Sequence, residues 1–196
     1  TIFSKQAVFE AGDFQITLLD TPGHVDFSAE MERTLQVLDY AILVVSGADG
    51  VQGHTRTLWR LLAMYGIPAF IFINKMDLER FGRDQLMNML KNQLDEGCVD
   101  FGQAGTAAFF EQLAMCDEGL METYLMAGRI DTHQIKEAIR WRRLFPCFFG
   151  SALRLEGVEA FIRGLTDYAT APVYPQEFRA KVFKISRDEK GNRLTH

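Results

Sequence analysis

Two uninterrupted apolar runs, residues 40–45 and 69–73, place the strongest limit on how this 196-residue chain folds. Strands that are apolar at every position are typical of sheets buried on both faces, and these are mostly parallel sheets. Residues 55–65 lie between the runs and have helical periodicity, which predicts a strand–helix–strand crossover. The chain is therefore expected to have an α/β fold with helices on both faces of a mainly parallel sheet.

The remaining elements predicted from the pattern surround this unit. Residues 7–10 and 14–19 alternate about a short Gly12-Asp13 turn, which predicts an antiparallel hairpin. Further predictions are a helix at 28–38, mainly helix over 84–144 with breaks at 97–105 and 128–131, a strand at 145–149 and a helix at 156–168. Beyond Pro175, a strand at 178–185, a turn at 188–192 and a returning strand that starts at 193–196 predict a second, β-rich domain over residues 175–196, after a first domain of residues 1–174.

Composition excludes several classes of protein. The net charge of −5 argues against an indiscriminate nucleic-acid coat, and three cysteines in no metal-ligand spacing are expected to be reduced and structural. No apolar run approaches transmembrane length, and the start lacks a signal-peptide pattern. We therefore expect a cytoplasmic protein with no membrane or DNA partner.

Three short motifs follow predicted strands, at the edge where parallel sheets bind ligands. The first is Asp20, Thr21, Pro22, Gly23 and His24. A carboxylate such as that of Asp20 suits magnesium, and Gly23 allows the backbone to approach a γ-phosphate. His24 would then project beside that phosphate, where it could orient an attacking water.

The second and third motifs suit recognition of a guanine base. In Asn74, Lys75, Met76 and Asp77, the last carboxylate can accept hydrogen bonds from the two guanine donors that adenine lacks. Asn74 can brace the loop, and the stem of Lys75 can cover the base. In the Gly150–Leu153 motif, small residues allow the backbone amides of Ser151, Ala152 and Leu153 to reach the guanine oxygen.

Each motif also has a simpler interpretation. The first could be a strand-to-helix turn in which Asp26 or Ser28 caps the helix, and the second a polar turn in which Asp77 does so. The third could be a small-residue loop needed only for packing. Their order along the chain and their common position after strands favour a nucleotide site.

Together these residues resemble the translational GTPases, specifically the elongation factor G group. Thr1-Ile2 is similar to the end of that family's Arg-Gly-Ile-Thr-Ile segment, and residues 25–27 and 49–55 also look like family sequence. Residues 118–125 and 145–151 are more similar to the tetracycline-resistance ribosomal protection proteins. The resemblance implies a P-loop-NTPase-like G domain that binds GTP or GDP and Mg²⁺, with Thr1 and Asp20 as metal ligands and the ribosome as partner. The second domain would be a β-barrel.

The family's glycine-rich phosphate loop and first strand are expected upstream of Thr1. The resemblance thus predicts a ribosome-associated GTPase, with His24 as the catalytic residue, that dislodges tetracycline. An elongation factor G type translocase and a non-catalytic GTPase-like interaction module are the alternatives. An ATP-dependent enzyme conflicts with Asp77.

Overall fold

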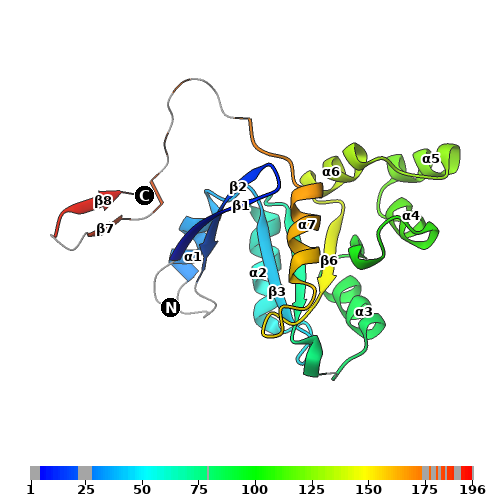
Figure 1. Ribbon diagram of the computed structural model, residues 1–196, viewed down its shortest axis with the longest axis horizontal. Helices are drawn as coiled ribbons and strands as arrows, with labels where there is room; N and C mark the ends of the chain where they lie inside the picture. The colour runs from blue at the N-terminus through cyan, green and yellow to red at the C-terminus, as the bar shows by residue number, and fades with distance from the viewer. Residues whose placement is uncertain are drawn as a thin grey trace.

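The computed structural model is built around a parallel sheet with helices on both faces (Figure 1). It describes residues 5–21, 28–78, 80–173, 177, 180, 182–183, 185–187 and 191–195. Four strands in the order β3-β4-β6-β5 form the sheet, and every neighbouring pair is parallel. These strands are β3 (Ala41–Ser46), β4 (Ala69–Asn74), β5 (Cys98–Asp100) and β6 (Phe145–Phe149). The predicted α/β class is confirmed.

Strand β5 was not predicted, because it lies inside a segment expected to be mainly helical. It has only three residues, too few for a periodicity to show, and it falls in the predicted break at 97–105. Its pairing with β6 places Cys98 opposite Phe145 and Asp100 opposite Cys147. Cys98 and Cys147 are fully buried and reduced, as the composition suggested.

Helices cover the sheet as two separate cores. One core packs β3 and β4 against α2 and α3, and the other packs the opposite face against α4, α6 and α7. The predicted helical segment divides because Asp117 and Asp131 cap new helices and Gly128 ends one in the left-handed conformation. The helices are α1 (Ser28–Leu35), α2 (Gly53–Met64), α3 (Arg83–Gln93), α4 (Ala107–Ala114), α5 (Glu118–Ala127), α6 (Thr132–Arg140) and α7 (Val158–Tyr168), with 3-10 turns η2 (Met76–Leu78) and η3 (Phe101–Gln103).

The predicted hairpin is also confirmed, as β1 (Lys5–Ala11) and β2 (Phe14–Asp20). Its turn uses Gly12 at a φ of +56°, which glycine adopts readily. The turn lies against Thr166 near the end of α7, since a Cβ added at Gly12 would be 3.8 Å from the Thr166 Cβ. Among the described strands, the hairpin forms a sheet of its own and does not pair with β3.

One edge of β3 is consequently unpaired within the described part of the chain. Val44 on this strand is 58% exposed, although its neighbour Val45 is 2% exposed. The apolar run at residues 40–45 predicted a strand buried on both faces, and this exposure is the main departure from that prediction.

Near the C-terminus, the structure describes a short antiparallel hairpin of β7 (Ile185–Arg187) and β8 (Arg193–Thr195). The returning strand was predicted at this position. Most of the strand predicted at 178–185 lies outside the described residues, so the β-barrel domain at 175–196 stays a prediction. No helix in the described ranges has the length and apolar character needed to span a membrane.

The adjacent valines of β3 give a matched test of the packing. We expect Val45→Ala to lower the free energy of unfolding by about 2 kcal/mol, because it removes two buried carbons from a close-packed core. Val44→Ala makes the same chemical change at an exposed position and should alter stability by less than about 0.5 kcal/mol. Urea denaturation of both variants would measure the difference, and equal losses would contradict this assignment of the two faces.

Candidate nucleotide site

The carboxyl ends of β4 and β6 are joined by backbone hydrogen bonds into a single platform. The Gly150 amide donates to the Ile73 carbonyl at 2.9 Å, and the Met76 amide donates to the Gly150 carbonyl at 3.1 Å. On the other side of β4, the Gly47 amide after β3 donates to the Asn74 carbonyl at 2.6 Å. The loops that carry the second and third motifs are therefore fixed to one another by the sheet.

Asn74 connects these two loops through its side chain. Its Oδ1 accepts hydrogen bonds from the amide of Lys75 at 2.8 Å and from the amide of Ala152 at 2.9 Å. Lys75 follows with a φ of +64°, a left-handed conformation that is uncommon for a non-glycine residue. Such conformations persist where the surroundings over-determine them, and here the Asn74 bond to the Lys75 amide helps to do so.

Asp77 lies on the 3-10 turn η2, beside Ser151 of the third motif. Its side chain is 11% exposed, and Arg154 Nε is 3.8 Å from its Oδ2. The neighbouring Ser151 hydroxyl, and more weakly the Arg154 guanidinium, holds the pKa of Asp77 below its usual value of 3.8. At neutral pH the residue is an ionised carboxylate whose oxygens can accept hydrogen bonds.

The Ser151 hydroxyl is itself buried, with 1% of the residue exposed. Its Oγ lies close to the Asp77 carboxylate, to which the hydroxyl can donate, and has no other partner among the described residues. A hydroxyl that donates to a carboxylate favours the ionised form. Ser151 therefore helps to keep Asp77 in the form that accepts hydrogen bonds.

Glycines make the third motif compact. The Ser151 and Glu156 backbones exchange two hydrogen bonds of 3.0 Å, which close the loop into a tight turn. A Cβ on Gly150 would collide with the Glu156 carbonyl, and Gly157 has a φ of +73°. Ala152 and Leu153 are exposed at the tip of this turn, beside the Asn74–Asp77 loop.

The first motif is only partly described. Asp20 ends β2 with its side chain exposed, and Thr21 is half-buried. The hairpin turn lies near the end of α7, which is the amino edge of the sheet, so β2 runs towards the carboxyl edge (Figure 1). Asp20 therefore points to the same side as Asn74 and Ser151. Within the described residues, no hydrogen bond or ion pair links it to either of them.

Thr1, Pro22, Gly23 and His24 lie outside the described residues, so their predicted roles stay predictions. Across the ranges that the structure does describe, no cluster of three or more His, Cys, Asp or Glu side chains is arranged to hold a metal. Asp20 is the described candidate for a metal ligand, and its exposed carboxylate has the hard oxygens that Mg²⁺ prefers.

The structure adds neighbours that the motifs did not indicate. Arg154 lies beside Asp77, and Glu156 closes the third loop through its backbone. After β3, the Ser46 hydroxyl donates to Asp49 at 2.8 Å and shapes the turn towards α2. The Glu156-Gly157 pair, at the start of the helix predicted over 156–168, was the available signal for a closed loop, and α7 begins only after it. Nothing in the spacing indicated Arg154.

Comparison with known proteins agrees with this geometry. The family model for the elongation factor Tu GTP binding domain matches residues 1–171. The chain belongs to this family. It is a translational GTPase by sequence, and its sheet with loops after β4 and β6 is the G-domain architecture of that family.

One curated relative is the "Oxytetracycline resistance protein" of Streptomyces rimosus, which is 32% identical over 223 aligned positions. That alignment covers 100% of this chain and 34% of the relative, so the chain spans about a third of the relative's length. A crystal structure of a protein from Thermus thermophilus superposes with a TM-score of 0.81 at 21% identity. The match covers 100% of this chain and 36% of the Thermus protein, and at this identity it supports the fold alone.

The two hydrogen bonds to Asn74 Oδ1 can be tested by replacement. Asn74→Ala removes the acceptor and leaves the Lys75 and Ala152 amides without their partner, which should lower the local opening free energy by about 1–2 kcal/mol. Asn74→Asp keeps the acceptor oxygens and should retain most of the protection. Amide hydrogen exchange at Ala152, followed by NMR, would check this, and unchanged exchange in Asn74→Ala would show that Asn74 does not hold the loops together.

Proposed function

We propose that the full-length protein binds and hydrolyses GTP, with Asp77 as the residue that selects guanine. The observation that carries this is the platform on which Asn74 joins the Lys75 and Ala152 backbones, with an ionised Asp77 beside the buried Ser151 hydroxyl. Membership of the elongation factor Tu GTP binding domain family supports the same conclusion.

In this proposal the base lies between the two loops. Asp77 accepts from the guanine N1–H and amino group, and the exposed Lys75 side chain covers the base face. The backbone of Ser151, Ala152 and Leu153 faces the guanine oxygen. The Ala152 amide already donates to Asn74 Oδ1, so it reaches the base only if that bond is shared or exchanged on binding.

The phosphate end of the nucleotide would meet the first motif. Thr1 and Asp20 would hold Mg²⁺, which neutralises charge on the phosphates when bound. Thr21, Pro22 and Gly23 would form the turn at the γ-phosphate, and His24 would orient the attacking water. An upstream strand carrying the phosphate loop completes the proposal, and the unpaired edge of β3 supports its place.

The ribosome is the proposed site of action, in the cytoplasm. The supporting observation is the 32% identity to an oxytetracycline resistance protein, which favours release of tetracycline over translocation as the role of the whole protein. Residues 1–174 would then be the G domain whose GTP hydrolysis drives the release of tetracycline. Residues 175–196 would be the start of a β-barrel domain.

Asp77→Asn tests base selection in the full-length protein. An amide donates where the carboxylate accepts, so the variant should lose its preference for GDP over xanthosine diphosphate by at least about 100-fold. Fluorescent nucleotide titration would measure both affinities. Asp13→Asn makes the same change in the hairpin turn and should leave the ratio unaltered; a guanine preference retained by Asp77→Asn would remove Asp77 from the site.

His24→Ala tests the chemical step separately. Loss of the group that orients water should reduce ribosome-stimulated GTP hydrolysis by roughly 10²–10⁴-fold, with GTP affinity nearly unchanged. His133→Ala, at an exposed position of α6, is the matched control and should hydrolyse GTP normally. Normal turnover by His24→Ala on ribosomes would show that another group performs this role, without affecting the guanine assignment.

A further inference from the structure

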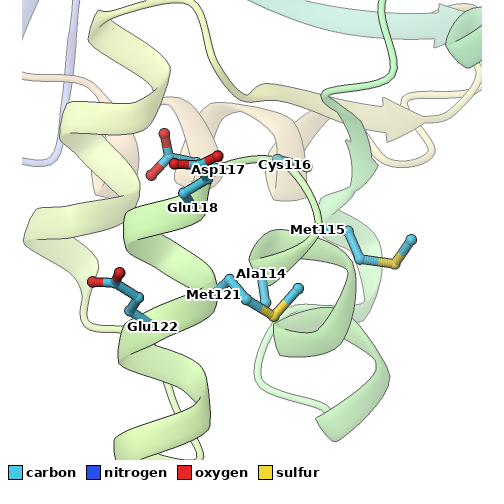
Figure 2. A pocket seen from close by; sticks show the side chains of 7 residues that line it. All are labelled: Ala114, Met115, Cys116, Asp117, Glu118, Met121 and Glu122. Carbon is cyan, nitrogen blue, oxygen red and sulfur yellow. The ribbon is translucent and has the colours of Figure 1, made fainter.

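A second surface lies where α4 turns into α5, in the segment between β5 and β6. The chain forms an open cleft of about 420 Å³ here, shown in Figure 2. In Figure 1 these helices stand apart from the lower edge where the strands end, so the cleft is distinct from the nucleotide platform. Its lining consists of Ala114, Met115, Cys116, Asp117, Glu118, Met121 and Glu122.

Helix α5 is apolar in composition but contributes little to the core. Leu120 is its one fully buried side chain, whereas Leu125 and Met126 are 75% and 89% exposed. Met115, at the end of α4, is 79% exposed. Exposed apolar side chains gathered on neighbouring helices are typical of interaction surfaces.

The exposed side of α5 combines these apolar groups with negative charge. Glu118, Met121, Glu122 and Leu125 follow the i, i+3, i+4, i+7 spacing of one helix face. Glu118 is stabilised by the amino end of the helix, but Glu122 lies one turn beyond it and has a like charge as neighbour. Among the described residues, no cation lies within ion-pair distance of either carboxylate.

The adjacent Arg143 pairs with Asp117 and not with either of these glutamates. Arg143 Nη1 is 2.6 Å from Asp117 Oδ2, and Asp117 also caps α5 by accepting from the Gly119 and Leu120 amides. This network ties the start of α5 to the turn before β6 and leaves the two glutamates for an external partner. Burial raises the pKa of the Cys116 thiol to about 11, so this lining group is uncharged at neutral pH.

We propose that the α4–α5 cleft is a docking site for a cationic amphipathic helix of a partner protein. Apolar side chains of that helix pack against Met115 and Met121, whose flexible thioethers adapt to varied shapes. Lys or Arg residues one turn apart on the partner match the one-turn spacing of Glu118 and Glu122. The same charges disfavour a phosphate-bearing ligand such as RNA.

The probe is a 15-residue peptide of leucine and lysine at helical spacing, and its counterpart replaces each lysine with glutamate. With the ¹⁵N-labelled 196-residue chain, the lysine peptide should shift the amides of residues 115–122, and the glutamate peptide should not. Binding should weaken as salt rises, because exposed charge pairs are screened. Shifts confined to other parts of the chain, or no binding of the lysine peptide, would overturn the proposal.

Matched variants test whether peptide binding depends on this cleft or on the overall negative charge of the chain. Glu118→Gln with Glu122→Gln should weaken the peptide by about two- to tenfold, as expected for two exposed ion pairs. Glu10→Gln with Asp13→Asn removes the same charge from the β1–β2 hairpin and should leave the affinity unchanged. Met115→Ser should also weaken binding. Equal weakening by both double variants, or self-association of the chain through this face, would contradict the assignment.

Discussion

The carboxamide oxygen of Asn74 is the point on which the rest of the candidate site depends. It holds the amide of the next residue and that of Ala152, which is 78 positions away along the chain. A loop after one strand and a loop after another are thereby given a fixed separation. The sheet brings these loops to the same edge, and the Asn74 side chain connects the backbone of the second loop to the first. The proposed base recognition therefore rests on a loop arrangement that the protein's own hydrogen bonds fix.

Much of this fold could be predicted because its strands are long, apolar and separated by clear helices. The runs at residues 40–45 and 69–73 predicted β3 and β4 closely, and the Gly12-Asp13 turn predicted the hairpin. Strand β5 could not be found in the same way, because three residues have no period and are defined by pairing with β6. The bounds of the mainly helical segment were predicted correctly. Its division into separate helices was not, because that depends on the helix caps at Asp117 and Asp131.

For the site, the motifs correctly indicated which residues lie near one another after β4 and β6. They could not indicate that the Ala152 amide is already engaged, or that Arg154 lies 3.8 Å from Asp77. Those features depend on how the 151–156 turn closes on itself, which is a tertiary property. The exposure of Val44 is likewise invisible in a pattern that records only apolar character. It depends on what packs against that face of β3.

The long excursion between β5 and β6 has a consequence for how members of this family can vary. The two strands pair directly although α4, α5 and α6 lie between them in the chain, and part of that excursion is packed in the same core as β6. The entropy of closing such a loop grows only with the logarithm of its length, so doubling it costs about 0.6 kcal/mol. Segments can thus be lengthened or shortened at the α4–α5 turn while β6 still holds Ser151 beside the Asn74–Asp77 loop. The sheet fixes the positions of the loops after β4 and β6, and the segment between β5 and β6 can differ in length among members of the family.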